Sequence, residues 1–168
     1  MTVKLIGAVF IIITASITGF RMSECVSLRE NRLRLILLMT DKVSSLIEYG
    51  SLHVSEIISV LSADRAFEKL RFLKKTSELI TSGKNFYDAW EQAVNGDGTL
   101  GEQEREVLLL IGSSLGRSNK KGQLSMLKLH SDSIRGIIAL LTPELNSKKK
   151  LYSSLGVLSG VFLSVMLI

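Results

Sequence analysis

The sequence has few of the residues that form covalent cross-links, metal sites or disordered chain. Cys25 is the one cysteine among 168 residues, so no disulfide can form within the chain, which is typical of a reducing compartment. The two histidines, His53 and His130, lie far apart and show no metal-ligand spacing. The single proline and the lack of low-complexity runs argue against disorder. We therefore expect a folded chain with no metal and no cofactor.

Charged residues are almost absent from both ends of the chain. Residues 1–20 hold only Lys4, and residues 151–168 hold none. The segment 21–150 carries the other 20 of the 21 Lys and Arg residues and all 16 Asp and Glu residues. The segment therefore has a net charge of about +4, from 20 basic and 16 acidic residues, and such a mild basic surplus suits the anionic face of a cytoplasmic leaflet. It lacks the concentrated basic stripe typical of nucleic-acid binding, so we expect no nucleic-acid partner.

The C-terminal segment 151–168 is apolar throughout and predicts a transmembrane helix. A helix rises about 1.5 Å per residue, and about 17–25 apolar residues cross the hydrocarbon core of a bilayer. Lys148, Lys149 and Lys150 precede the segment, and such a basic cluster marks the cytoplasmic side of a membrane. The alternative is a buried C-terminal helix of a soluble protein, but core helices rarely lack charge over that length.

The N-terminal segment 1–20 predicts a second transmembrane helix. A cleaved signal peptide competes with this interpretation, with Lys4 as its basic start and a cleavage site near Ala15-Ser16. The apolar run continues past that site to Phe20, and Arg21 follows it, which favours an uncleaved helix. Basic residues beside both predicted spans then place the intervening domain, 21–150, in the cytoplasm of a cell-membrane protein.

The segment 21–150 shows helical periodicity and no run of period-two alternation, which predicts an all-α bundle of about six helices. Gly50 and Gly83 are expected to end helices, and Asn85 to begin one as its N-cap. Pro143 is expected to kink the last helix. The predicted inward-facing residues, helix by helix, are Leu28, Leu35, Met39, Val43 and Leu46; Val54, Ile57, Ile58 and Leu61; Phe67, Leu70, Leu73, Ser77 and Ile80; Phe86, Ala89, Trp90, Ala93 and Val94; Val107, Leu108, Ile111, Ser114 and Leu115; Leu127, Ser131, Ile134, Ile138, Leu141 and Leu145.

The segment between the fourth and fifth predicted helices has one feature of a calcium loop. Asn95, Asp97, Thr99 and Glu106 fall at positions 1, 3, 5 and 12 of such a loop. Position 6 is Leu100, where the loop needs glycine for its sharp turn, so we expect no calcium site. The simpler interpretation is a capping box from Thr99 to Glu102 that starts the fifth helix.

The turn before the last helix is the candidate site. Arg117, Lys120 and Lys121 surround a helix start that Ser118 or Asn119 is expected to cap. The helix dipole disfavours cations at this position, whereas basic side chains and free amides attract anions. No Gly-rich phosphate loop is present, so the turn favours a solvated or protein-contact surface over nucleotide binding. The five residues 117–121 are therefore candidate partner contacts, and no catalytic set of residues is evident elsewhere.

Short motifs along the chain carry a family resemblance. They are Leu5-Ile6-Gly7-Ala8, Ile47-Glu48-Tyr49-Gly50 with Glu56, Gly83 with Ala89-Trp90-Glu91, Leu115-Gly116-x-Ser118 with Gln123, and Leu155-Gly156-Val157-Leu158. With them the whole chain resembles the stage III sporulation protein AB family of endospore-forming Firmicutes. The sequence departs from that pattern at Asn119, where the family usually has aspartate, and at His53, where proline is common. Asn119 can still cap a helix, so the departure bears on any role of a negative charge there.

The resemblance implies a non-enzymatic function. The soluble part would be similar to the cytoplasmic helical domain of type II secretion and type IV pilus inner-membrane platform proteins. The protein would belong to the channel complex that joins mother cell and forespore, in the mother-cell membrane around the forespore. Its implied partners are the complex's own cytoplasmic secretion-type ATPase, other channel membrane proteins and the lipid bilayer. A hypothesis from a different class is a membrane-anchored helical enzyme or ligand sensor that uses a pocket in the bundle.

Overall fold

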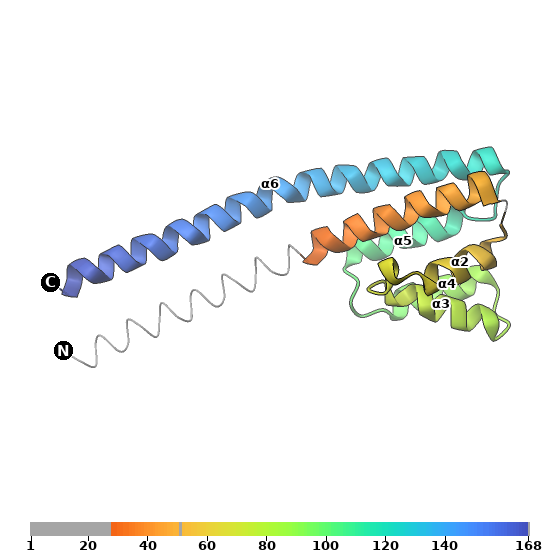
Figure 1. Ribbon diagram of the computed structural model, residues 1–168, viewed down its shortest axis with the longest axis horizontal. Helices are drawn as coiled ribbons and strands as arrows, with labels where there is room; N and C mark the ends of the chain where they lie inside the picture. The colour runs from red at the N-terminus through yellow and green to blue at the C-terminus, as the bar shows by residue number, and fades with distance from the viewer. Residues whose placement is uncertain (1–27, 51, 168) are drawn as a thin grey trace. The chain divides into compact units, whose positions relative to one another are not determined.

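The computed structural model describes residues 28–50 and 52–167, with side chains described as far as residue 143 (Figure 1). The predicted N-terminal span, 1–20, and Cys25 lie outside the described residues. Residues Asn31–Ile138 form one compact unit, and the two ends of the chain, Met1–Glu30 and Ala139–Ile168, belong to another. The candidate site lies in the first unit.

The prediction of an all-α fold is confirmed for the described residues, which form six α-helices and no strand. The first helix, 28–45, ends in a π-helical turn, Leu46–Gly50. A short 3-10 turn, Arg65–Phe67, joins the second and third helices. The others are α2, Val54–Ala63; α3, Arg71–Thr81; α4, Phe86–Gly96; α5, Glu102–Ser114; and α6, Lys120–Leu167.

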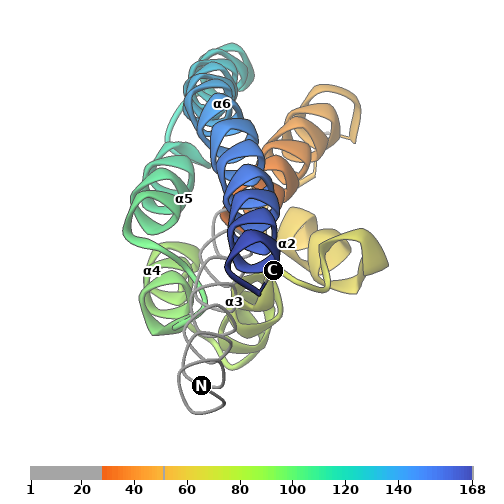
Figure 2. The same cartoon turned by 90° about the vertical axis from the view of Figure 1, so that its left-hand side faces the viewer.

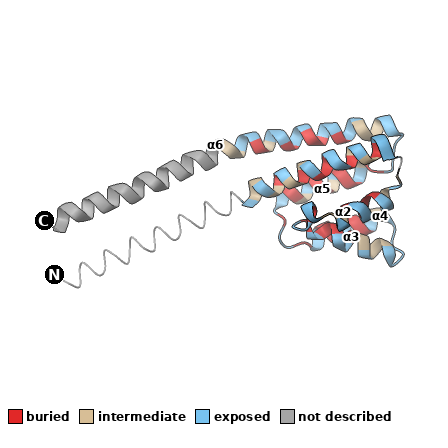
Figure 3. Cartoon of the chain, viewed as in Figure 1, coloured by how far each residue is buried: buried red, intermediate tan, exposed pale blue. Residues whose placement is uncertain are grey.

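Within the compact unit, helices that follow one another in sequence pack together, α2 on α3, α3 on α4 and α4 on α5. Figures 1 and 2 show the first helix and α5 running beside the beginning of α6. Buried faces line the inside of this arrangement, and exposed faces cover its outside (Figure 3). The pattern is that of a helical bundle with one apolar core.

The last helix, α6, does not end at Pro143 but continues to Leu167. Proline removes one backbone donor from a helix without necessarily ending it, and the kink expected at Pro143 stays a prediction. Leu127, Ser131, Ile134 and Ile138 are buried on α6, as their heptad-like spacing predicts. Among the residues whose side chains are described, 28–50 and 52–143, no helix meets both requirements for crossing a membrane, sufficient length and sufficient apolar character.

The core centres on Trp90 of α4, which is 2% exposed, as predicted. Its indole ring lies edge-on to Phe72 of α3, with ring centroids 5.2 Å apart and planes at 77°. The indole Nε1–H donates to the Leu108 carbonyl oxygen of α5 at 2.8 Å, so the one polar atom of the ring is satisfied. A Cβ on Gly112 of α5 would overlap the same ring, which explains why glycine suits this position.

The buried face of the first helix is rotated from the predicted one. Met39 and Val43 are buried as predicted, but Leu28 is 60% exposed, and Leu35 and Leu46 are only half-buried. Leu33, Ile36, Thr40 and Ile47 fill the core instead. Residues 33 and 35–38 are all leucine or isoleucine, so helical spacing alone selects no single face there.

The third predicted helix begins later than expected. Phe67 and Leu70 are buried, but they belong to the 3-10 turn and to the residue before α3. Phe72 and Thr76 face the core, while Ser77 and Ile80 are half-buried. Leaving the helical path between residues 68 and 70 shifts the periodicity and with it the inward face.

The predicted capping boxes and caps have mixed outcomes. The Asn85 cap is confirmed, because its Oδ1 accepts from the Asp88 amide at 3.0 Å. The Thr99–Glu102 capping box is wrong, because α5 begins at Glu102 after Gly101, and the Glu104 carboxylate accepts from the Gly101 amide at 2.6 Å. Arg32 draws Glu104 into this place through a 3.1 Å ion pair, a tertiary contact that no local pattern reports. Thr99 instead donates to Asp97.

Candidate functional site

The candidate site is the basic turn, defined here as residues 117–121, between α5 and α6. Leu115, fully buried, ends α5, and its carbonyl oxygen accepts from the Tyr87 hydroxyl at 2.8 Å. Gly116 follows with φ of 73°, a left-handed conformation that glycine adopts without strain. The chain therefore leaves the core at a fixed position and in a fixed direction.

Two side chains hold the turn in shape. Gln123 accepts from the Gly116 amide at 3.0 Å and donates to the Ser118 carbonyl oxygen at 2.8 Å. Asn119 caps α6, since its Oδ1 accepts from the Gly122 amide at 2.8 Å. Of the two predicted caps, the structure selects Asn119. A Cβ on Gly122 would overlap the Ser118 hydroxyl, so the turn closes tightly on the first turn of α6.

The three cations of the turn have different surroundings. The Arg117 guanidinium carbon lies 4.7 Å from the centroid of the Tyr87 ring, a cation–π contact. Lys120 donates through Nζ to the Glu48 carbonyl oxygen at the end of the first helix. Lys121 is exposed. Arg117 and Lys120 thus have structural roles that offset the unfavourable helix dipole, and Lys121 is left as the cation most available to a partner.

The five predicted contact residues are consecutive and lie together in this turn, and their role in partner contact stays a prediction: Arg117, Ser118, Asn119, Lys120 and Lys121. Sequence reasoning missed Tyr87 and Glu48, which lie far from the turn in sequence and contact it through the fold. The presence of Tyr87 on α4, one residue from the predicted inward position Phe86, was a weak signal. The carbonyl of Glu48 gives no sequence signal, because every residue carries one.

The described histidine and acidic side chains were compared with the spacing that a metal site needs. No group of three or more His, Cys, Asp or Glu side chains within residues 28–50 and 52–143 is placed to hold a metal ion. His130 of α6 is buried, which lowers the pKa of its imidazole below the usual 6.5. A buried neutral histidine is more often a packing residue than a ligand, and no partner set converges on it here.

Comparison with known proteins identifies the chain's family. The family model for stage III sporulation protein AB matches residues 4–168, nearly the whole chain. The stage III sporulation protein AB of Bacillus subtilis (strain 168) is 26% identical over 168 residues, covering 98% of both chains. No solved structure matches the chain significantly. The resemblance seen in the sequence is confirmed, and the chain belongs to the stage III sporulation protein AB family.

Proposed function

We propose that this protein is a non-enzymatic membrane platform of the channel complex between mother cell and forespore. Membership of the stage III sporulation protein AB family assigns it a role in sporulation, and the match over residues 4–168 carries the proposal. The platform role itself comes from the resemblance of its helical domain to secretion-system platform proteins. A folded bundle between two apolar chain ends is the organisation that such a platform needs.

The proposed topology has two spans, residues 1–20 and 151–168, with the bundle in the cytoplasm of the mother cell. Its support is the sequence, in which three lysines precede an uncharged segment and basic residues follow the first apolar one. The backbone of α6 is helical as far as Leu167, so one helix would carry the chain from the bundle into the membrane surrounding the forespore.

The topology is tested with Cys25, the chain's one cysteine. A membrane-impermeant thiol reagent should label Cys25 only after the mother cells are opened. A cysteine added after Ile168 should also be labelled in intact cells, as long as the space around the forespore is open to the outside, and it serves as the control. Labelling of Cys25 in intact cells would overturn the cytoplasmic placement.

The basic turn is the proposed docking site for the complex's cytoplasmic secretion-type ATPase. The support is its fixed geometry, with Gln123 and Asn119 holding the backbone, and its three cations on one short exposed segment. Such a surface suits an acidic patch on the partner. Charges of this kind act mainly on the association rate, and their effect falls as salt rises.

The experiment is a pull-down of the ATPase by the full chain from detergent-solubilised membranes, with Lys121→Glu as the test variant. Lys128→Glu is the matched control, since Lys128 is an exposed lysine on the same helix away from the turn. Lys121→Glu should fold as wild type, because an acid suits a helix N-terminus, and should bind the ATPase more weakly. A variant with all three cations changed to glutamate would be a less specific test, because it also breaks the intramolecular contacts of Arg117 and Lys120.

Two results would contradict the docking proposal. Equal capture by wild type, Lys121→Glu and Lys128→Glu would remove the basic turn from the interface. Capture that does not fall as salt rises would remove its charge from the interaction. Failure of the wild-type chain to capture the ATPase at all would contradict the recruitment role itself.

A further inference from the structure

A recess of about 350 Å³ opens beside the basic turn. Its apolar lining comes from Ile47, Leu52, Val54 and Ile57, at the end of the first helix and the start of α2. Lys120 and Gln123, from the first turn of α6, also line it, and so do His53 and Gly116. Val54 also lies close to Gly116, because a Cβ on that glycine would come within 3.3 Å of Val54 Cγ2. The recess and the basic turn are therefore parts of one surface.

The recess combines an apolar floor with a positive rim. Lys120 lines it and carries a full charge. None of its lining residues is a carboxylate, although the Glu56 carboxylate accepts from the amide of the lining residue His53 at 2.8 Å and lies beside the α2 end. Lys121 and Arg117 belong to the same short turn and add positive charge to that surface. Two helices, α2 and α6, begin at the recess, and the partial positive charge of their N-terminal ends has the same sign.

We propose that this recess receives one apolar side chain of the docking partner, from a segment in which carboxylates flank that side chain. The inference rests on the proposed docking function and specifies its chemistry. The apolar floor selects a side chain of the size of leucine or phenylalanine, and the rim selects its acidic neighbours. Interfaces gain most of their affinity from such a residue buried in a pocket, surrounded by contacts that exclude water.

The recess is large enough to receive one anchoring side chain together with parts of its flanking residues. Pockets for small molecules measure about 300–1,000 Å³, and this one lies at the lower end of that range. Ile57 is 1% exposed and Ile47 is 7% exposed, so the floor belongs to the packed core. A floor of that kind keeps its shape, and a preformed pocket loses little conformational entropy when it is filled.

The test uses the full chain in nanodiscs of phosphatidylcholine. This lipid has no net charge, so it does not compete with an acidic peptide for the basic side chains of the turn. The probe is the peptide acetyl-Glu-Phe-Glu-amide with a trifluoromethyl group on the ring, observed by fluorine NMR. We expect line broadening that gives a Kd on the order of 1 mM, as befits a peptide that fills one subsite. The same peptide with lysines in place of the glutamates should bind about tenfold more weakly or not at all.

Two pairs of variants locate the binding. Val54→Phe should fill the recess and weaken binding by about tenfold. Val60→Phe, on an exposed position of the same helix, should leave it unchanged. Lys120→Gln should weaken binding where Lys128→Gln does not, and it tests the site independently if Val54→Phe disturbs the fold.

Each other outcome overturns the inference. Absence of peptide binding would mean that the recess takes no such anchor. Equal binding of the acidic and basic peptides would remove the role of the rim. Undiminished binding by both Val54→Phe and Lys120→Gln would place the site elsewhere. The peptide experiment does not use the ATPase, so its result stands apart from the pull-down that tests the docking function.

Discussion

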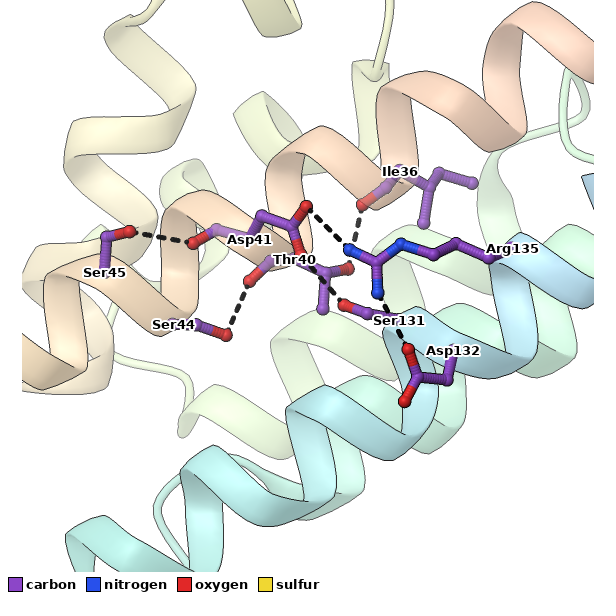
Figure 4. A network of polar contacts seen from close by, with 8 residues as sticks. All are labelled: Ile36, Thr40, Asp41, Ser44, Ser45, Ser131, Asp132 and Arg135. Carbon is purple, nitrogen blue, oxygen red and sulfur yellow. Dashed lines mark hydrogen bonds and ion pairs between the residues drawn. The ribbon is translucent and has the colours of Figure 1, made fainter.

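The bundle holds its helices together in two different ways. Helices α3, α4 and α5 interlock through apolar shape, with the Trp90 ring set between Phe72 and the backbone at Gly112. The first helix and α6 are joined by a polar seam, shown in Figure 4. There Ser131 donates to Asp41 at 3.0 Å, and Arg135 lies 3.4 Å from the same carboxylate and 2.8 Å from Asp132.

The two kinds of contact contribute differently, since one mainly stabilises the fold and the other mainly fixes the position of one helix along its neighbour. Apolar burial supplies most of the stabilising free energy and tolerates small rotations as long as the volume is filled. Directional hydrogen bonds supply less, but they fix how far one helix has slid along its neighbour. We infer that the packing of Trp90 against Phe72 and Gly112, called the interlock below, stabilises the domain. The polar seam sets the register of α6, the helix whose first turn carries Lys120 and Lys121.

The largest expected effect is at the interlock. Trp90→Ala should lower the free energy of unfolding by about 3–5 kcal/mol, because a buried aromatic ring is lost and a cavity remains. That is a large fraction of the stability of an ordinary domain. Thermal unfolding of the full chain in mild detergent, followed by circular dichroism at 222 nm, measures it. A loss below about 1 kcal/mol would contradict the central position of this ring.

A smaller loss of stability is expected at Gly112, where a substitution overfills the core instead of leaving a cavity. Gly112→Ala inserts a methyl group into the space of the indole ring and should cost about 1–3 kcal/mol. Gly136→Ala is the matched control, because a Cβ there meets nothing within 4 Å, and it should be neutral or stabilising by up to about 1 kcal/mol. In a Trp90→Ala background the cost of Gly112→Ala should largely vanish, and its persistence would locate the clash elsewhere.

The same two regions show what the sequence predicts and where prediction stops. Trp90 was assigned to the core because one large ring stood on a helix face with Ala89 and Ala93. The polar seam was not predicted, since Asp41 and Arg135 are ordinary surface residues until the fold brings them together. The Glu104 cap escaped prediction for the same reason, because its partner Arg32 is 72 residues away.

The candidate site also combines features that the local sequence predicts with contacts that only the fold reveals. The basic turn and its Asn119 cap are local features, and sequence reasoning found them. The contacts with Tyr87 and Glu48, and the recess lined by Val54 and Lys120, require distant segments to meet. The local sequence therefore predicted an exposed basic turn, and the fold revealed that Arg117 and Lys120 already contact Tyr87 and Glu48.

At the polar seam, Asp41→Ala should cost about 1–2 kcal/mol, because it removes the acceptor of the Ser131 hydroxyl, a residue only 3% exposed. Arg135→Ala should cost less than about 1 kcal/mol, since both partners of that ion pair are about half exposed. Unfolding measured at low and high salt distinguishes them. The Arg135 effect should shrink with salt, and equal effects of the two variants would mean that the ion pair dominates the seam.

The smallest expected effect is a pH dependence that arises one residue from the seam, at His130. Burial lowers the pKa of His130 below its usual 6.5, and its Nε2 has no hydrogen-bond partner among the described residues. The folded protein therefore keeps this ring neutral, whereas the unfolded chain takes up a proton once the pH falls below about 6.5. The stability linked to His130 should be fully present above that pH and should fall as the pH is lowered towards the depressed value.

Denaturation midpoints at pH 7.5 and 5.5 measure this, with His130→Gln as the test variant and His53→Gln, at an exposed histidine, as the control. Other groups titrate equally in all three proteins, so His130→Gln should lose less stability than wild type between the two pH values, and His53→Gln should match wild type. An identical fall in all three proteins would mean that the charged ring finds an acceptor in the folded state.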